Sequence, residues 1–456
     1  MLNENTLRNH YNLSRECGEV TRALCEDDEA RFFRLDRDRP EFPRLMADCR
    51  YPVSAWPLLL STETINRFTE IVREVPSLIF RAARRCYEYA PRRFRARYPL
   101  PDLAYERLCD AGEPTNVLVR WDFVLVDNVP KLLEANVGSR AGGWRSDWFW
   151  PQLAEMIRHR PGSEHWKLSH TNILDMFCRY MHRAVRAHVK QVTTGNILVI
   201  FAPYFFQYGF DEELSALYDQ TLAGTAHPGR LLFDDNVDSL TIRNDGRIEY
   251  RGDVIDGIMG TSEHATIPPE MNEAHLKRMI FYPDNELHLM LDDKSNFATL
   301  CQAKAAGWLD EHDARLVEDY VPWTALLTTD PVEWEGEKVS ARDLALASKD
   351  ALVLKRGVSC QGKDVYVGRF LSPEEWSTVI ERAGTSGDWV IQAYCPPDRL
   401  YAPNGESVVT EHEAVWGVFG LGGEYGGVFG RLMEPDRGCG VVNVARGATM
   451  AVVLEV

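Results

Sequence analysis

The feature that most constrains this sequence is a strand pair that carries charge where a buried sheet should be apolar. Alternate residues from Val117 to Leu125 are apolar, which is the two-residue period of a strand with one buried face. Asp127-Asn128 with Pro130 just after is a turn signal, so we expect a β-hairpin. The opposite face of the first strand carries Arg120 and Asp122.

A turn centred on Asn128 predicts which residues of the two strands face each other. It places Val124 opposite Leu132, Asp122 opposite Glu134 and Arg120 opposite Asn136. Two opposed carboxylates repel each other and are costly to bury. A divalent cation would turn that cost into a binding site, and two acids with one amide suit Mg²⁺. Arg120 could bind a phosphate at the same place. The alternative is a charged, solvated strand edge.

Length, charge and cysteine usage narrow the class of protein. A chain of 456 residues can form two or three domains with a large core. Its net charge of −17 argues against nucleic acid and anionic membranes as partners. Ten scattered cysteines indicate reduced thiols rather than a disulfide framework. With neither a signal-peptide core at the start nor an apolar run of about 18 residues, we expect a cytoplasmic protein without a membrane span.

Residues 1–114 are expected to form a mainly helical region. Ser61 and Thr62 are typical of a helix start, and the sequence predicts a helix that ends before Pro76 and a second helix after it. The stretch from Arg81 to Arg97 holds seven arginines and one acid, Glu88. This basic face is either a solvated surface or a docking site for an acidic partner such as a phosphopantetheine carrier protein.

A polar, glycine-rich loop follows the hairpin from Gly138 to Gly143. Glycines let the backbone approach a ligand closely, and Arg140 and Arg145 could meet a substrate carboxylate there. An ordinary connecting loop is the alternative.

The middle of the chain predicts an α/β unit. Apolar residues recur every four positions between residues 170 and 190, which indicates an amphipathic helix that we interpret as core. The apolar run Ile197–Ala202 is typical of a buried parallel strand. Short strands follow as far as residue 260, with a hairpin at Asp245-Gly246.

The C-terminal third contains two lysines in suggestive positions. Asp292-Asp293-Lys294 opens a predicted helix, and the strand Ala351–Lys355 ends in a charge. A small-residue loop that contains Gln361 and a second strand follow, as in folds that lay a loop over phosphates, but there is no Walker A sequence. One more strand covers Trp389–Tyr394.

Together these residues resemble the ATP-grasp ligases. The R-x-D-F of Arg120–Phe123 and the E-x-N of Glu134–Asn136 match best the glutathionylspermidine-synthetase-like branch, in which the metal motif precedes the lysines in a circularly permuted order. The resemblance covers about residues 115–456. It implies a mixed α+β and α/β fold, in which two α+β subdomains sandwich ATP. We therefore expect a hairpin with an α/β unit over 115–290 and nucleotide-binding subdomains over 291–456.

The resemblance also implies roles for individual residues. Asp122, Glu134 and Asn136 would bind Mg²⁺, and Arg120 would bind the transferred phosphoryl group. Lys294 and Lys355 would bind the ATP phosphates. Other parts of the nucleotide would contact Gln361, Gln392, Ala393 and Tyr394, and the substrate acid would bind Arg140 and Arg145. The adenine contacts of residues 392–394 would come largely from the backbone.

The implied activity is an ATP-dependent carboxylate–amine ligase that works through an acyl phosphate and releases ADP and phosphate. Three alternatives stay open at this point: loading of an amino acid onto a carrier-protein thiol, a small-molecule kinase, and a nucleotide-binding protein without turnover. Glu411, Glu413 and Glu424 could accept the proton of the amine, or could be strand-surface charges.

Overall fold

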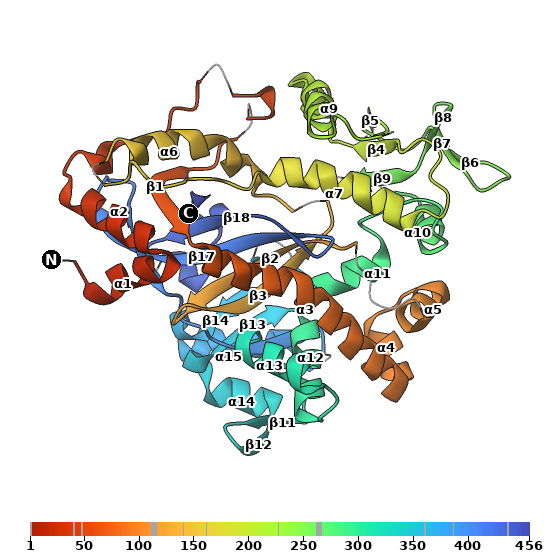
Figure 1. Cartoon of the computed structure of the whole chain (residues 1–456). Helices are drawn as coiled ribbons and strands as arrows, with labels where there is room; N and C mark the ends of the chain where they lie inside the picture. The colour runs from red at the N-terminus through yellow and green to blue at the C-terminus, as the bar shows by residue number, and fades with distance from the viewer. Residues whose placement is uncertain are drawn as a thin grey trace.

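One central sheet joins distant parts of the chain (Figure 1). The computed structural model describes residues 2–39, 42–46, 49–110, 116–139, 141–160, 162–226, 228–260, 267–359, 362–385, 387–435 and 437–456. The sheet follows the order β1-β19-β18-β17-β2-β3, and β16 also pairs with β17. Its strands are β1 (Val53–Leu60), β2 (Leu118–Val126), β3 (Val129–Val137), β16 (Arg399–Pro403), β17 (Val409–Leu421), β18 (Glu424–Met433) and β19 (Thr449–Glu455). The sheet thus combines strands from all three predicted regions of the chain, 1–114, 115–290 and 291–456. The boundaries of these regions stay a prediction.

The β2–β3 hairpin confirms the predicted pairing of the charged residues, but its turn is shorter than predicted and one strand has a bulge that was not predicted. Asp127 and Asn128 have φ of 49° and 63°, so they form a two-residue hairpin turn one residue shorter than expected. A bulge at Leu133 restores the lost residue. Asp122 therefore faces Glu134 and Arg120 faces Asn136, whereas the predicted Val124–Leu132 pair is wrong because Val124 faces Lys131.

The apolar face of β2 packs under one long helix. Helix α3 (Thr62–Tyr89) crosses this face, and its Phe68 ring lies 4.8 Å from that of Phe123. Ser61 caps the helix as predicted, but the predicted break at Pro76 is wrong, because α3 continues through it. Proline removes one helical hydrogen bond. Buried apolar residues on both sides of Pro76 hold the two halves to the same core and offset that loss.

The remaining N-terminal elements surround α3 and the edge of the sheet. They are α1 (Glu4–Leu13), α2 (Arg15–Glu26), α4 (Pro91–Arg97), α5 (Asp102–Asp110) and the 3-10 turns η1 (Ala30–Phe32) and η2 (Arg44–Met46). Strand β1 was not predicted, because Pro57 argues against a strand. It is tolerated because β1 is an edge strand and its register with β19 shifts between Ser54 and Leu58.

The other face of the central sheet, called the site face here, carries Arg120 and Asp122 and is partly covered by the predicted α/β unit. Strands β5-β4-β9 are parallel, and β4 is wholly buried, as expected. The amphipathic helix is confirmed as α7, and β6–β7 form the predicted hairpin. Between the hairpin and residue 290, the chain forms η3 (Trp144–Phe149), α6 (Trp150–Arg158), α7 (Ile173–His188), β4 (Ile197–Ile200), α8 (Pro203–Gln207), α9 (Phe210–Thr221), β5 (Leu231–Asp234), β6 (Leu240–Ile242), β7 (Ile248–Tyr250), β8 (Asp253–Ile255), β9 (Gly257–Gly260), α10 (Pro269–Leu276) and α11 (Glu286–Leu289).

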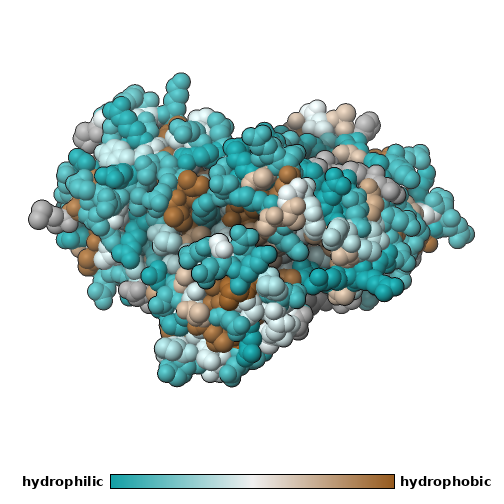
Figure 2. Space-filling model, turned by 90° about the horizontal axis from the view of Figure 1, so that it is seen from below, coloured by the Kyte–Doolittle hydropathy of each residue, from teal (hydrophilic) through white to brown (hydrophobic). Residues whose placement is uncertain are grey.

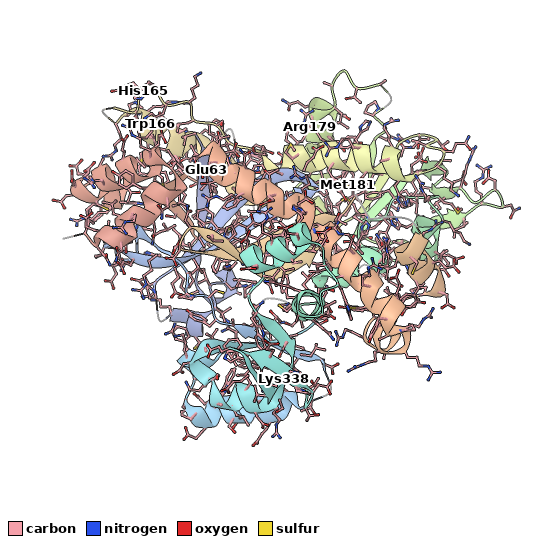
Figure 3. All side chains as sticks on the ribbon, turned by 60° about the horizontal axis from the view of Figure 1, so that its bottom comes forward. Glu63, His165, Trp166, Arg179, Met181 and Lys338 are labelled. Atoms are coloured by element: carbon pink, nitrogen blue, oxygen red, sulfur yellow. The ribbon has the colours of Figure 1, made fainter. Side chains whose placement is uncertain are left out.

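A second, four-stranded sheet, β10-β15-β13-β14, forms the lobe drawn below the central sheet in Figure 1. Figure 3 marks this lobe by Lys338 and the α/β unit by Arg179 and Met181 on α7. From residue 290 onward, the elements outside the central sheet are η4 (Met290–Asp292), α12 (Ser295–Ala305), α13 (Glu311–Tyr320), β10 (Thr324–Leu326), β11 (Pro331–Trp334), β12 (Glu337–Ser340), α14 (Ala341–Ala347), η5 (Lys349–Ala351), β13 (Leu352–Arg356), β14 (Val365–Val367), η6 (Gly368–Phe370), α15 (Pro373–Ala383), β15 (Trp389–Ala393), η7 (Arg437–Gly440) and η8 (Val444–Arg446).

The face of the molecule that is seen from below is mostly hydrophilic, and its larger hydrophobic patches gather near the middle (Figure 2). None of the helices in the described part of the chain has both the length and the apolar character needed to cross a membrane.

Buried histidines predict how stability depends on pH. His10 of α1 accepts a hydrogen bond from the Tyr401 backbone at 2.7 Å, and burial lowers its pKa to about 3. The unfolded chain therefore binds a proton at His10 between pH 6.5 and 3 that the folded chain rejects, so this contribution to stability is complete above pH 6.5 and is lost as pH falls. Lowering the pH from 6.5 to 5 should reduce the free energy of unfolding by about 2 kcal/mol through this residue.

Urea unfolding at both pH values measures the effect. His10→Gln keeps an acceptor for Tyr401. Its free energy of unfolding should depend less steeply on pH, because about one proton fewer is taken up on unfolding, while the other ionisations are common to both proteins. An identical pH slope in the variant would contradict the assignment.

Candidate functional site

The site face is organised around a buried carboxylate that two arginines hold. Arg120 binds Asp122 through two contacts, Nε to Oδ1 at 2.8 Å and Nη2 to Oδ2 at 3.0 Å. Arg431 of β18 adds a third, Nη2 to Oδ2 at 2.7 Å. The side chain of Asp122 is only 2% exposed. Burial alone would raise the pKa of Asp122, but Arg120 and then Arg431 outweigh it and lower the pKa to about 2, so the group is ionised at neutral pH.

The opposing acid, Glu134, has a cation of its own. Lys294 at the start of α12 lies 3.2 Å from Glu134 Oε2 and also donates to the Ser359 carbonyl at 3.2 Å. Each of the facing carboxylates is therefore neutralised from a different part of the chain. Asn136, two positions along β3, has a buried Nδ2 without a hydrogen-bond partner in the described residues.

Lys355 joins the four-stranded sheet to the hairpin. From β13 its Nζ donates to the carbonyl of the bulged Leu133 at 3.0 Å and to Gln392 Oε1 at 2.6 Å. Gln392 in turn donates to Thr324 Oγ1 at 3.1 Å. Burial lowers the pKa of Lys355 to about 8, although Glu134 opposes the shift. The bulge thus serves the site directly, because it turns a strand carbonyl toward a buried lysine.

A narrow pocket of about 90 Å³ lies between the two sheets. Asp122, Glu134 and Lys355 reach it from one end. Gln392, Ala393 and Tyr394 also line it, as the prediction requires of an adenine site. The backbone N–H groups of Ala393 and Tyr394 already donate to Trp323 and Ala351, so they are engaged inside the lobe.

A second and larger cavity of about 480 Å³ lies on the other side of the arginines. It separates the site face from the α/β unit, and Arg120, Arg145, Ile173 and Phe177 are among its lining residues. Part of the α7 stripe that was interpreted as core therefore faces a cavity. Arg431 and Asn443 line both spaces, so the pocket and the cavity meet at these two residues.

Phe429 packs close to both arginines because two glycines make room for it. Its ring centre lies 5.6 Å from the guanidinium carbon of Arg120 and 5.6 Å from that of Arg431. A Cβ on Gly143 would come within 2.2 Å of this ring, and one on Gly417 within 2.5 Å. Gly417 lies between Asp122 and Phe429 in the sheet register, so a side chain there would displace the ring or the Arg120 side chain, whose Cδ lies 3.2 Å away.

The glycine-rich loop is fixed at both ends. Ser139 donates to both carboxylate oxygens of Asp284, each at 2.6 Å, and Arg120 Nη1 donates to the Gly142 carbonyl at 2.6 Å. Arg145 follows the loop and lies with its guanidinium carbon 5.0 Å from the Trp144 ring centre. The predicted residues Arg140 and Gln361 lie outside the described residues.

Arginines of the basic face are used largely within the fold. Arg81 binds Asp313, Arg84 donates to the Leu108 carbonyl at 3.1 Å, and Arg95 contacts Asp102 at 2.6 Å. Carrier-protein docking at residues 81–97 stays a prediction.

The glutamates considered as proton acceptors occupy other surroundings. Glu411 pairs with Arg399 at 3.0 Å, Glu424 pairs with Arg183, and Glu413 is buried in β17. Asp292 precedes Lys294 by two residues, and burial raises its pKa to about 6 although Lys294 opposes the shift.

Sequence reasoning missed the role of Arg431 and the cavity with its Phe429 wall. The available signal was a single arginine in an otherwise apolar strand, Val428–Met433. Such a charge needs a partner, but only the sheet order, which brings β17 between β2 and β18, identifies Asp122 as that partner.

Comparisons with known proteins bear on the fold. No family model and no curated protein matches the sequence. Among solved structures, the chain resembles a glutathione synthetase-like effector from Globodera pallida in its apo form, with a TM-score of 0.55 and 10% identity over 89% of this chain and 90% of the other. The chain thus has the predicted mixed α+β, ATP-grasp type of fold.

Gly417→Ala tests the packing of the site. The added Cβ would lie 2.5 Å from the Phe429 ring, so we expect a loss of about 1–3 kcal/mol in the free energy of unfolding, measured with urea. Gly405→Ala is the matched control, because a Cβ there meets no atom within 4 Å, and its change should stay within about 0.5 kcal/mol. Equal stability of the two variants would contradict the described packing.

Proposed function

We propose that this protein is an ATP-dependent carboxylate–amine ligase of the ATP-grasp type, related to the circularly permuted glutathionylspermidine-synthetase-like branch. The observation that carries the proposal is the meeting of two spaces at Arg431 and Asn443. One space is lined by the buried Lys355 and by the strand assigned to adenine, and the other is lined by arginines suited to a carboxylate. The order of the motifs, with the hairpin before Lys294 and Lys355, supports the permuted branch.

The donor set around the hairpin fits Mg²⁺. Asp122 is ionised at neutral pH, Glu134 is its direct cross-strand neighbour, and Asn136, whose buried Nδ2 has no hydrogen-bond partner in the described residues, would supply its amide oxygen. Asp122 Oδ1 accepts a hydrogen bond from Arg120 Nε at 2.8 Å and has a further lone pair that can bind a metal. Mg²⁺ held by these three residues would supply charge neutralisation for the ATP phosphates, with water and phosphate completing its shell.

Lys294 and Lys355 would bind the ATP phosphates on the lobe side. Both ammonium groups now bind protein oxygens, Lys294 that of Ser359 and Lys355 that of Leu133, and both would exchange them for phosphate oxygens. The pocket of about 90 Å³ is smaller than the roughly 300 Å³ at the low end of ligand pockets. ATP binding would therefore require the four-stranded sheet to move away from the site face.

The reaction proceeds in two displacements. A carboxylate oxygen of the acid attacks the γ-phosphorus of ATP while the bond to the β-phosphate oxygen breaks, giving an acyl phosphate and ADP. The amine nitrogen then attacks the acyl carbon, inorganic phosphate leaves, and the nitrogen gives up a proton. Arg120 and Arg431, which both bind Asp122, would stabilise the negative charge that develops and would hold the two anions together. Asp292, whose pKa burial raises to about 6, would accept the proton near neutral pH.

Release of ADP tests the activity. With acid, amine, ATP and Mg²⁺ present, ADP and phosphate should form together, and formation should fall at least 100-fold in Asp122→Asn and in Lys355→Met. Lys338→Met, on the exposed β12 of the same lobe, is the matched control and should keep full activity. Full ADP release by Asp122→Asn at low Mg²⁺ would refute the role of the hairpin.

The intermediate separates a ligase from a kinase. Hydroxylamine should trap the acyl phosphate as a hydroxamate when amine is left out, whereas a phosphorylated alcohol would be stable to it. Phosphorylated product without hydroxamate would favour a kinase on the same scaffold.

The charge of Lys355 predicts the pH dependence of nucleotide affinity. Its pKa of about 8 means that the free enzyme loses this positive charge as pH rises through 8, so the affinity for the nucleotide should fall between pH 7 and 9. Calorimetric titration with a non-hydrolysable ATP analogue and Mg²⁺ measures this. Lys355→Arg keeps its charge over the range and should show a smaller decline; an equal decline would assign the effect to another group.

A further inference from the structure

The cavity of about 480 Å³ is shaped for more than a carboxylate. Its walls come from η3, α7, α8, α9 and from the strands of the site face, and they are mostly apolar. Six phenylalanines contribute, Phe177, Phe201, Phe205, Phe210, Phe419 and Phe429. A volume within the range of small-molecule sites, with aromatic walls and few polar groups, is typical of a pocket that binds an apolar group.

The charged groups of the cavity all have the same sign. Arg120, Arg145 and Arg431 line it, and no Asp or Glu is among its described lining residues. A carboxylate would be bound by these guanidinium groups, whereas an ammonium group would meet like charge with no acid to balance it. The amine substrate therefore has no suitable place in this cavity.

The arginines also fix the direction of a bound acid. Arg431 lines both the cavity and the nucleotide pocket, and Arg120 lies beside it on Asp122. A carboxylate at these two residues would lie next to the proposed γ-phosphate position, and the rest of the molecule would occupy the phenylalanine-lined part of the cavity. The lining also includes two exposed residues, Tyr51, which is 49% exposed, and Ala445.

We propose that this cavity binds the acid substrate, an apolar carboxylic acid without a free ammonium group, such as an N-acylated hydrophobic amino acid or a peptide that ends in one. This inference rests on the proposed ligase function for the role of the acid, but the binding itself needs no nucleotide. The apolar side chain fills the phenylalanine-lined part, the carboxylate binds Arg120 and Arg431, and the acyl group points to the surface at Tyr51 and Ala445.

Calorimetric titration of the full chain without ATP tests the proposal. The probes are N-acetyl-L-phenylalanine, L-phenylalanine and glutarate. N-acetyl-L-phenylalanine should bind at least roughly tenfold more tightly than either of the others, because only it combines an aromatic group, a carboxylate and no ammonium. L-phenylalanine or glutarate binding as tightly as the N-acetylated probe would overturn the proposal.

Two variants locate the bound probe. Ala445→Trp places a large side chain at the exposed end of the cavity and should weaken N-acetyl-L-phenylalanine at least roughly tenfold, while the ATP analogue, whose pocket Ala445 does not line, still binds. Arg179→Ala, on the exposed face of α7, is the control and should leave probe affinity unchanged (Figure 3). Unchanged probe affinity in Ala445→Trp would overturn the assignment to this cavity.

Activity assays separate this inference from the proposed function. If glutarate with an amine releases ADP and N-acetyl-L-phenylalanine does not, the ligase stands and the apolar-acid inference falls. If N-acetyl-L-phenylalanine binds as expected and no pair of acid and amine releases ADP, the cavity assignment stands and the ligase proposal falls.

Discussion

The buried ion cluster of Arg120, Asp122 and Arg431 is the interaction on which the rest of the site depends. A carboxylate that is 2% exposed would be strongly destabilising alone, and removing one partner of a buried pair typically costs about 3–5 kcal/mol. The two arginines come from strands that are not neighbours, so the cluster forms only when β17 has inserted between β2 and β18. Assembly of the central sheet and assembly of the charged centre are therefore the same event.

The intervening strand explains why glycine occurs where it does. Gly417 sits between Asp122 and Phe429 in register, and its missing side chain leaves space for the Phe429 ring and the Arg120 side chain. The ring then packs close to both guanidinium groups and lines the cavity beside them. Glycine at position 417 is thus a packing requirement of the site.

Local patterns predicted the parts of the fold that depend on local chemistry, such as the hairpin, α7, β4 and the strand that ends in Lys355. The charged pairing was right because two errors cancelled: the turn is one residue shorter than expected and the bulge at Leu133 adds one back. Strand β1 and the continuous α3 were not predicted, since Pro57 and Pro76 act locally against them while the burial that stabilises them is tertiary. For the same reason, Arg431 could not be assigned a partner before the strand order was known.

The charge distribution reconciles an acidic protein with a site for anions. The chain has 68 acidic and 51 basic side chains, yet Arg120, Arg145, Arg431, Lys294 and Lys355 converge on the two adjoining spaces. In water with physiological salt, the acidic surface is screened beyond about 8 Å, so it does not cancel the field of cations inside a cavity with apolar walls. Small anions that fit between the walls experience this local field, whereas a polyanion such as nucleic acid meets the acidic exterior first. In the proposed acid site, the apolar walls would act on both the selectivity and the strength of binding, because they would exclude water from the arginines and favour an anion that has an apolar part.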